Sequence, residues 1–279
     1  MTGREYATPF SMLHAALLLG QKTRLTKFNN AIREIVKTND YIVDIGTGSG
    51  VLAIMAAKAG AGKVTAIDIN SESLDYARQA AELNGVIDKI DFIEEHFSDF
   101  FPDAKADVVI CEMLSSILLV EQQVPASYHA VENILKPDGI IIPQNATIYV
   151  VPVESQVMFD RFSMEKLQFP RVVQTMSHGS SRDLADIQVL ARIDFTKLTD
   201  NYAIDETLTF RIISDGEIHG LAGLFESELY RNIKLDMVDG WKQLFIPFSN
   251  PIKVKVEGEF SVRIAYTPGQ FNSLVVEPF

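Results

Sequence analysis

Three glycines in one short loop constrain this fold more than any other feature of the sequence. The stretch VDIGTGSG (43–50) follows an apolar run that favours a strand and precedes VLAIMAAKAG (51–60), which favours a helix ending in glycine. Glycines allow a sharp bend and let a ligand lie against the backbone. Because the spacing is two and two, tighter than the dinucleotide pattern GxGxxG, a nucleoside without phosphates fits the loop better than a dinucleotide.

Strand-like and helix-like segments alternate through the first half of the chain. After YIVDI (41–45), four more β-rich apolar runs lie at 63–69, 89–95, 106–112 and 140–143. Helical patterns separate several of them, and the segment 71–85 has a Ser71 cap, an acidic first turn and a glycine stop. This alternation predicts βαβ units and a parallel sheet, so the expected fold class is α/β with a doubly wound, Rossmann-like domain.

After Pro143 the sequence pattern changes to short runs of period two, separated by Gly, Pro, Asn or Asp. Such runs predict a mostly antiparallel β-barrel or sandwich. The stretch 157–190 fits neither pattern and is interpreted as a mixed helical insertion or arm. We therefore expect N-terminal helices in 1–37, the Rossmann-like domain in 38–143 and the β-barrel-like domain in 144–279.

The charge and the cysteine content exclude several classes of partner and site. The formal net charge of −12 disfavours a nucleic-acid partner, whose phosphates the protein would repel. The single cysteine, Cys111, excludes an intramolecular disulfide and fits a reducing compartment. No Cys/His cluster has the spacing of metal ligands, so no metal site is expected.

The N-terminal run FSMLHAALLLG (10–20) is as long as the core of a signal peptide. However, His14 interrupts it, Glu5 precedes it and no small-residue cleavage site follows, so an amphipathic helix is the better interpretation. No apolar run approaches the roughly 18 residues of a membrane span. We expect a soluble, cytoplasmic protein with no membrane partner.

A carboxylate at the end of the second strand completes the expected ligand site. Asp68 lies eighteen residues after Gly50, and sheet topology places both at the carboxyl edge of the strands. A carboxylate there can accept hydrogen bonds from two ribose hydroxyls. The alternative is a plain glycine turn with Asp68 as a surface residue.

Two glutamates bracket the apolar stretch CEMLSSILLVE (111–121). Glu112 ends the fourth strand, so it should lie at the same edge as the glycine loop, and Glu121 follows nine positions later. Two carboxylates beside an apolar pocket repel each other unless a cation bridges them or one is protonated. A guanidinium suits the pair because its planar fork can engage both. Alternatively, Glu112 caps a helix and Glu121 lies on a solvated face.

The stretch VDIGTGSGVLAIMAAKAGAGKVTAIDIN resembles the first two motifs of the class I S-adenosylmethionine-dependent methyltransferases. The resemblance implies S-adenosyl-L-methionine as the cofactor. It places the methionine part against the loop formed by Asp44, Gly46, Gly48 and Gly50. It also implies that Asp68 binds the ribose and that Ser98, in EEHFSDF, lies near the adenine, where Asp99 is equally plausible.

The rest of the chain resembles one branch of that superfamily, the protein arginine methyltransferases. The matching stretches are CEMLSSILLVEQQVPA, ILKPDGIIIPQNATIYVV, DGEIHGLAGLFESELYRNIKL and WKQLFIPF. The resemblance covers nearly the whole chain and implies that Glu112 and Glu121 are catalytic. It further implies that Arg24 binds the methionine carboxylate of the cofactor and that the arm at 157–190 forms a homodimer.

The elements that close over the substrate depart from the family pattern. In REYATPF, Tyr6 remains as an aromatic residue, but Pro9 lies near another aromatic position of the family. The family's Thr-His-Trp loop reads Asp239-Gly240-Trp241 here, and Gln21 stands where the family has the aspartate that pairs with that histidine. Both members of an ion pair are absent together, so the alignment is self-consistent. Because the substrate-closing elements differ while the cofactor half and the carboxylate pair match, a changed or relaxed substrate is expected.

Three functions follow from these observations. The leading hypothesis is a methyltransferase that N-methylates a guanidinium or amine of a protein or peptide, with Glu112 and Glu121 orienting the nitrogen. The second is a methyltransferase for a small molecule or a ribosomal-protein amine, because the glycine-loop region resembles bacterial ribosomal-protein methyltransferases equally well. The third is a non-catalytic, cofactor-binding scaffold. Labelling of a cell extract with labelled cofactor separates the three.

Overall fold

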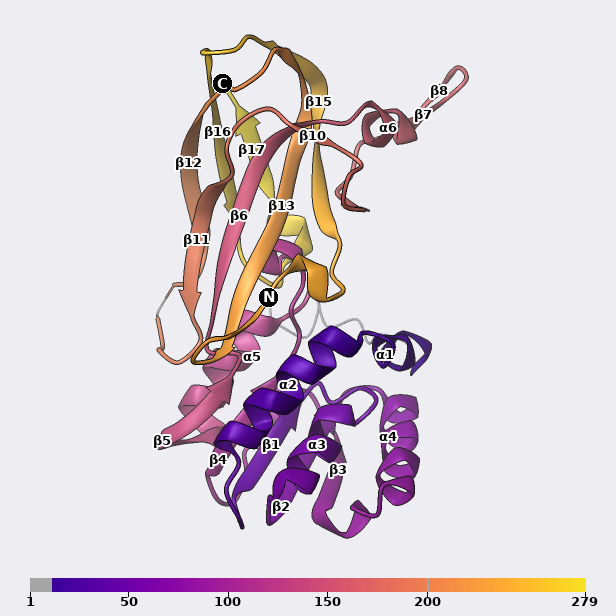
Figure 1. The fold of residues 1–279 in the computed structure, drawn as a ribbon, viewed down its shortest axis with the longest axis vertical. Helices are drawn as coiled ribbons and strands as arrows, with labels where there is room; N and C mark the ends of the chain where they lie inside the picture. The colour runs from indigo at the N-terminus through magenta and orange to yellow at the C-terminus, as the bar shows by residue number, and fades with distance from the viewer. Residues whose placement is uncertain (1–11, 200) are drawn as a thin grey trace.

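The computed structural model describes residues 12–199 and 201–279, so the expectations for Tyr6 and Pro9 lie outside the described residues. Figure 1 shows an elongated molecule with an α/β domain at one end and a β domain at the other. In the described ranges no helix is long and apolar enough to cross a membrane, and no cluster of His, Cys, Asp and Glu could hold a metal ion.

The five parallel strands of the first sheet confirm the predicted α/β class. They are β1 (Tyr41–Ile45), β2 (Lys63–Asp68), β3 (Ile90–Glu94), β4 (Ala106–Cys111) and β5 (Leu135–Ile142). The order is β3-β2-β1-β4-β5. The strand order therefore reverses between β1 and β4, which are neighbours in the sheet. Ligands of open parallel sheets bind at this switch point, outside the carboxyl ends of the strands.

Helices cover both faces of this sheet because its buried strands are apolar on both sides. One face, which includes Ile42 and Val64, packs with α2 (Lys22–Ile35), α3 (Val51–Ala59) and α4 (Ser71–Leu83). The other, which includes Val43 and Val109, packs with α5 (Gln123–His129) and the π-helix η5 (Ala130–Ile134). A short helix, α1 (Met12–Leu18), precedes α2. The two expected N-terminal helical pieces thus correspond to α1 and α2.

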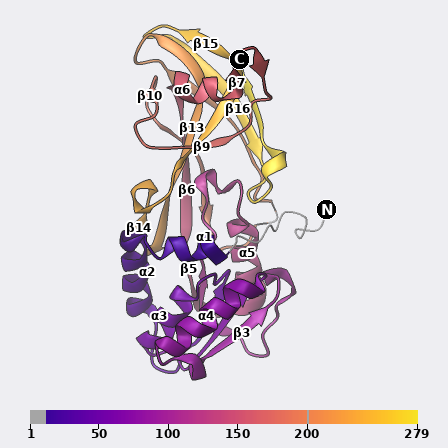
Figure 2. The same cartoon turned by 90° about the vertical axis from the view of Figure 1, so that its right-hand side faces the viewer.

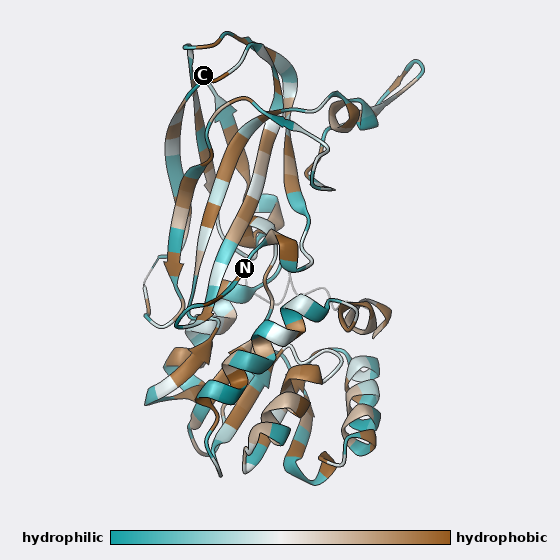
Figure 3. Ribbon diagram, in the orientation of Figure 1, coloured by the Kyte–Doolittle hydropathy of each residue, from teal (hydrophilic) through white to brown (hydrophobic). Residues whose placement is uncertain are grey.

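The second half of the chain is antiparallel, as its period of two predicts. One sheet contains β6 (Asn145–Glu154), β9 (Gln174–Met176), β10 (Arg182–Asp183), β11 (Gln188–Asp194), β13 (Gly216–Tyr230), β14 (Ile233–Leu235) and β15 (Gln243–Val254). A second sheet contains β12 (Ile204–Arg211), β16 (Glu259–Tyr266) and β17 (Val275–Pro278). Buried and exposed residues alternate along β16, and Figure 3 shows hydrophobic and hydrophilic residues alternating along β6 and β13.

The stretch 157–190 differs from its prediction as a helical arm. Its helical part is confined to α6 (Gln156–Phe159) and the 3-10 turn η6 (Asp160–Phe162), and a small hairpin follows, β7 (Ser163–Met164) with β8 (Leu167–Gln168). The expectation of a helix is wrong for the rest because the chain reverses at Glu165 and then joins the barrel sheet through β9 and β10. The α6 segment and its hairpin project from the barrel (Figure 1).

The two domains meet along helix α2. This helix packs against α3 of the Rossmann-like domain, and it also contacts β13, β14 and the 3-10 turn η7 (Met237–Asp239) of the β domain. Figure 2 shows β14 directly beside α2. One contiguous set of buried apolar side chains runs from Ile42 in the parallel sheet to Phe260 in the barrel. Residues of both domains can therefore contribute to one site at their junction.

Gly50 should prove to be a structural requirement of the glycine loop. Its φ is +76°, and an added Cβ would lie 2.7 Å from the Cβ of Ala77 on α4. Gly85 has a similar φ of +67°, but an added Cβ there meets nothing within 4 Å. We expect Gly85→Ala to lower the free energy of unfolding by about 1 kcal/mol through left-handed strain alone. Gly50→Ala should cost roughly 2 kcal/mol more because of the overlap.

Denaturant unfolding of both variants measures this difference. Equal losses of stability would show that α4 moves away to accept the added methyl group.

Candidate active site

A buried carboxylate stabilises the glycine loop through hydrogen bonds. Asp44 is 1% exposed; its Oδ2 accepts hydrogen bonds from Thr47 Oγ1 at 2.6 Å and from the Ala53 N–H at 3.1 Å. Burial raises the pKa of Asp44 to about 7, and these hydrogen bonds act against the rise. The structure therefore places Asp44 under the loop, where it ties the turn to the first turn of α3.

Asp68 and the glycine loop lie together, as the sheet topology predicts. Its Oδ2 accepts a hydrogen bond from the Gly48 N–H at 2.8 Å, and its Oδ1 accepts one from the Asn70 N–H at 2.9 Å. Burial raises the pKa of this carboxyl. Gly46 and Gly48 also have positive φ angles, of 70° and 52°. Because each carboxylate oxygen can accept a second hydrogen bond, Asp68 keeps acceptor capacity for two hydroxyls of a ligand.

Ser98 lies beyond the end of β3, in the 3-10 turn η3 (Phe97–Asp99). Its hydroxyl is 2.8 Å from Nδ1 of His96, which also accepts a hydrogen bond from the Ser98 N–H. His96 therefore orients Ser98 within its own turn. The assignment of Ser98 to the adenine stays a prediction.

Arg24 is paired with a residue of the chain, and its expected pairing with the cofactor carboxylate stays a prediction. The resemblance implies a cofactor carboxylate as its partner, but in this structure Arg24 on α2 forms a salt bridge with Glu112, and both side chains are about nine-tenths buried. A buried guanidinium requires an anion, and the end of β4 supplies it. Arg24 also donates a hydrogen bond to Gln21 Oε1 at 2.9 Å and lies 4.3 Å over the ring of Trp241.

Glu121 is close enough to this guanidinium for the two charges to affect each other. Burial raises the pKa of Glu121 to about 7, and the positive charge of Arg24 acts against this rise. Burial lowers the pKa of Arg24 to about 10, while the charges of Glu121 and Asp239 raise it. Arg24 thus pairs with Glu112 and interacts electrostatically with Glu121. The bridging of both glutamates by one cation stays a prediction.

Met113 connects the two groups of residues. It follows Glu112, and its Cγ lies 3.2 Å from the position of an added Cβ on Gly46. Its backbone N–H donates a hydrogen bond to Gln123 Oε1 at 2.8 Å. The residue that follows Glu112 therefore lies directly beside the glycine loop, which brings the end of β4 and the loop into one site.

Sequence reasoning missed an ion pair that joins helix α2 to the barrel. Lys27 Nζ of α2 lies 2.6 Å from Oδ2 of Asp239, whose side chain is fully buried. These residues are 212 positions apart, and no local pattern indicates such a pair. Beside it, Gln21 packs on Gly240, where an added Cβ would lie 2.5 Å from the Gln21 side chain. The two positions that depart together from the family pattern are thus neighbours.

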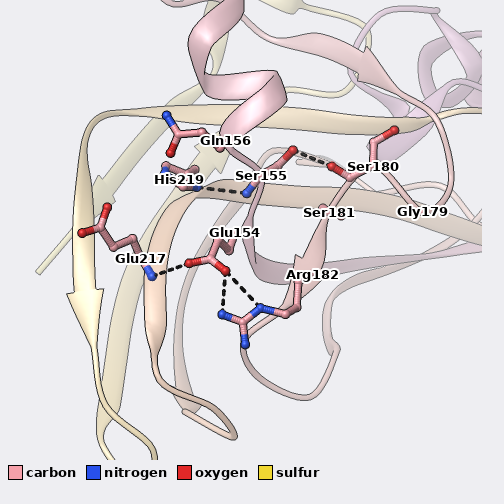
Figure 4. A pocket seen from close by; sticks show the side chains of 9 residues that line it. All are labelled: Glu154, Ser155, Gln156, Gly179, Ser180, Ser181, Arg182, Glu217 and His219. Atoms are coloured by element: carbon pink, nitrogen blue, oxygen red, sulfur yellow. Dashed lines mark hydrogen bonds and ion pairs between the residues drawn. The ribbon is translucent and has the colours of Figure 1, made fainter.

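A separate hollow of about 450 Å³ lies at the root of the arm (Figure 4). Its polar groups bind one another: Glu154 accepts hydrogen bonds from Arg182 and from the Glu217 N–H, and the Ser155 N–H donates to Nδ1 of His219 at 3.0 Å. These contacts stabilise the junction of arm and barrel. None of the site residues expected from the sequence lines this hollow.

Comparison with known proteins finds relatives of both halves of the chain. The family model for ribosomal protein L11 methyltransferase (PrmA) matches residues 25–162, and that for the PRMT5 oligomerisation domain matches residues 145–268. The uncharacterized protein MJ1452 of Methanocaldococcus jannaschii is 32% identical over 76% of this chain and 82% of its own length. The arginine N(omega)-methyltransferase of Streptomyces achromogenes subsp. streptozoticus is 27% identical over 90% of this chain and 75% of its own.

A solved structure has the same fold. The Trypanosoma brucei PRMT1 enzyme-prozyme heterotetrameric complex with AdoHcy (S-adenosylhomocysteine) aligns with a TM-score of 0.77 at 19% identity, covering 94% of this chain and 96% of the matched one. The likeness therefore extends through both the parallel sheet and the barrel.

Asp68 should be required for binding of the cofactor product S-adenosylhomocysteine. Asp68→Ala removes the acceptor offered to the ribose, and we expect the Kd to rise by at least about tenfold, the loss of one charged hydrogen bond. Calorimetric titration measures the affinity. Asp91→Ala is the matched control, because Asp91 is an exposed carboxylate of β3 paired only with Lys63 at the surface. Equal affinities for the two variants would remove Asp68 from the site.

Proposed function

The chain belongs to the class I S-adenosylmethionine-dependent methyltransferases and shares the fold of the protein arginine methyltransferases, and on this premise we propose that it methylates a guanidinium nitrogen of arginine in a protein or peptide. One observation carries the proposal. The guanidinium of Arg24 forms a salt bridge with Glu112 and acts electrostatically on Glu121, so the carboxylate pair accommodates this chemical group. The relative from Streptomyces, named as an arginine N(omega)-methyltransferase, supports the same acceptor.

In the proposed reaction the protein positions the acceptor and removes a proton. Bound S-adenosylmethionine supplies a methyl group already activated on a sulfonium. The two carboxylates hold the acceptor guanidinium so that one nitrogen points along the line of transfer, and the buried surroundings exclude water. Glu121 is suited to accept the proton that this nitrogen loses, because its pKa of about 7 lies near neutral pH.

For an acceptor to enter, Arg24 must leave its position beside Glu112. The methionine carboxylate of the cofactor is the anion expected to receive it, as the family resemblance implies. Arg24 would then have an ionic partner in both states, and the ring of Trp241 could support the guanidinium by stacking. The carboxylate pair would be opened to the acceptor only when the methyl donor is in place.

The second candidate acceptor is an amine of a ribosomal protein. It is favoured by the match of residues 25–162 to the ribosomal protein L11 methyltransferase model. An ammonium could also pair with two carboxylates, but as a point charge it lacks the planar fork by which a guanidinium engages both. Labelled cofactor added to a cell extract distinguishes the candidates: methylarginine in a protein supports the first, a methylated amine the second, and a labelled small molecule contradicts both.

Replacement of either glutamate should abolish turnover and leave cofactor binding intact. We expect Glu112→Gln and Glu121→Gln to lower kcat by at least about 100-fold, because each removes a charge that orients or deprotonates the acceptor. The affinity for S-adenosylhomocysteine should stay within about threefold of the parent. Glu132→Gln is the control, since Glu132 lies exposed on η5. Full activity in either test variant would contradict the assigned role.

We also propose that the arm forms a homodimer. Five apolar side chains between 157 and 172 are more than half exposed: Val157, Met164, Leu167, Phe169 and Val172. An apolar group of this extent on a projecting segment is typical of an interface. The match of residues 145–268 to an oligomerisation domain supports this proposal.

The dimer predicts a specific effect of charge on the arm. Leu167→Asp should shift the protein from dimer to monomer in sedimentation velocity, because it places a charge in an apolar interface. Val256→Asp, which changes a similarly exposed valine after β15, should leave the mass unchanged. A monomeric parent protein, or a dimer that resists Leu167→Asp, would contradict the proposal.

A further inference from the structure

The segment between the two glutamates has an unusual backbone conformation. Ile117 and Leu118 have φ angles of 52° and 54°, in the left-handed region, and both side chains are buried. This region is rare for bulky residues and a marked outlier for a β-branched residue such as isoleucine. Such strain persists only where the surroundings impose it, and it is most often found at functional sites.

Hydrogen-bond donors from the end of the barrel impose this conformation. Tyr266 Oη on β16 donates a hydrogen bond to the Ile117 carbonyl at 2.7 Å. The Gly269 N–H donates to the Leu118 carbonyl at 2.9 Å, and Trp241 Nε1 donates to the Leu114 carbonyl at 2.9 Å. All three join residues more than 100 positions apart in the sequence. The barrel therefore donates hydrogen bonds to three of the five backbone carbonyls from residue 114 to residue 118.

A gap in β13 accommodates the side chain of Ile117. An added Cβ on Gly223 would lie 2.5 Å from Cγ2 of Ile117. A glycine inside a long strand weakens the strand and often marks a close approach of another group. Here the absence of a side chain at Gly223 leaves room for Ile117 in its left-handed conformation.

The strained residues lie inside a loop that hydrogen bonds close between Ser115 and Glu121. Ser115 Oγ accepts hydrogen bonds from the Val120 and Glu121 N–H groups at 3.3 and 3.2 Å. The segment 115–121 is thus a closed loop whose start binds its end. Relaxation of Ile117 to an ordinary conformation would redirect the chain four residues before Glu121 and pull its backbone away from Ser115.

We infer that Tyr266 is a positioning residue for Glu121: its hydroxyl holds Ile117 in the left-handed conformation that sets the direction of the chain leading to Glu121. Tyr266 is itself almost fully buried and reaches the site only through the Ile117 carbonyl. The inference rests on the proposed function for its effect on catalysis. Its effect on the position of Glu121 does not depend on which acceptor is methylated.

The test compares Tyr266→Phe with Tyr149→Phe, a control on β6 of the same barrel. We expect Tyr266→Phe to lower kcat at least about tenfold with little change in the KM of the acceptor. The Kd for S-adenosylhomocysteine should stay within about twofold. The pKa of Glu121, about 7 in the parent because of burial, should fall toward the ordinary carboxylate value as the displaced side chain meets water. Tyr149→Phe should change none of these quantities.

Carboxyl NMR, with the Glu121 signal assigned through Glu121→Gln, measures this pKa without any turnover. A parent protein that fails to methylate arginine but shows the pKa shift in Tyr266→Phe would contradict the proposed acceptor and support the positioning role. Unchanged kcat and an unchanged Glu121 pKa in Tyr266→Phe would overturn the positioning role. Should Tyr266→Phe not fold, Gly223→Ala, which displaces Ile117 from the other side, is expected to produce the same fall in kcat and in the Glu121 pKa.

Discussion

The buried contact of Arg24 with Glu112 is the interaction on which the site depends. Arg24 comes from α2, Glu112 from the end of β4, and the ring of Trp241 that stacks on the guanidinium comes from the barrel. A buried ion pair is stable only when its geometry is good and its remaining donors are satisfied. Gln21 accepts a further hydrogen bond from Arg24. The interaction therefore fixes three segments of the chain relative to one another at the carboxyl edge of the sheet.

The charge balance about this pair explains why the site favours a cationic acceptor. Arg24 provides one positive charge, and the two glutamates provide two negative charges when both are ionised. Burial removes Glu121 from water, and this loss of hydration is the cause of its raised pKa. A second cation would relieve this imbalance, and a proton is the alternative. A guanidinium acceptor supplies the charge, the planar shape and the proton that Glu121 can take.

Local sequence patterns predicted what depends on neighbouring residues and on sheet topology. The glycine loop, the parallel strands and the placement of Asp68 and Glu112 at one edge follow from segments that are continuous in sequence. The partner of Arg24, the Lys27–Asp239 pair and the bond from Tyr266 to Ile117 could not be predicted, because each joins residues between 88 and 212 positions apart. The helical arm was mispredicted because α6 is only four residues long and has no period to recognise.

The residues that depart from the family pattern change the means by which the barrel closes on the site. Gln21 lies between Arg24 and Gly240, accepting a hydrogen bond from the first and donating a long one of 3.4 Å to the carbonyl of the second. A neutral amide thus stands where the family has an ion pair. Six residues along the same helix, Lys27 binds the buried Asp239. This second pair joins the same helix to the same barrel loop, so the barrel stays attached to α2 although the family's histidine and aspartate are absent. The change is therefore confined to the junction of α2 with the barrel loop, while the contact of Arg24 with Glu112 remains.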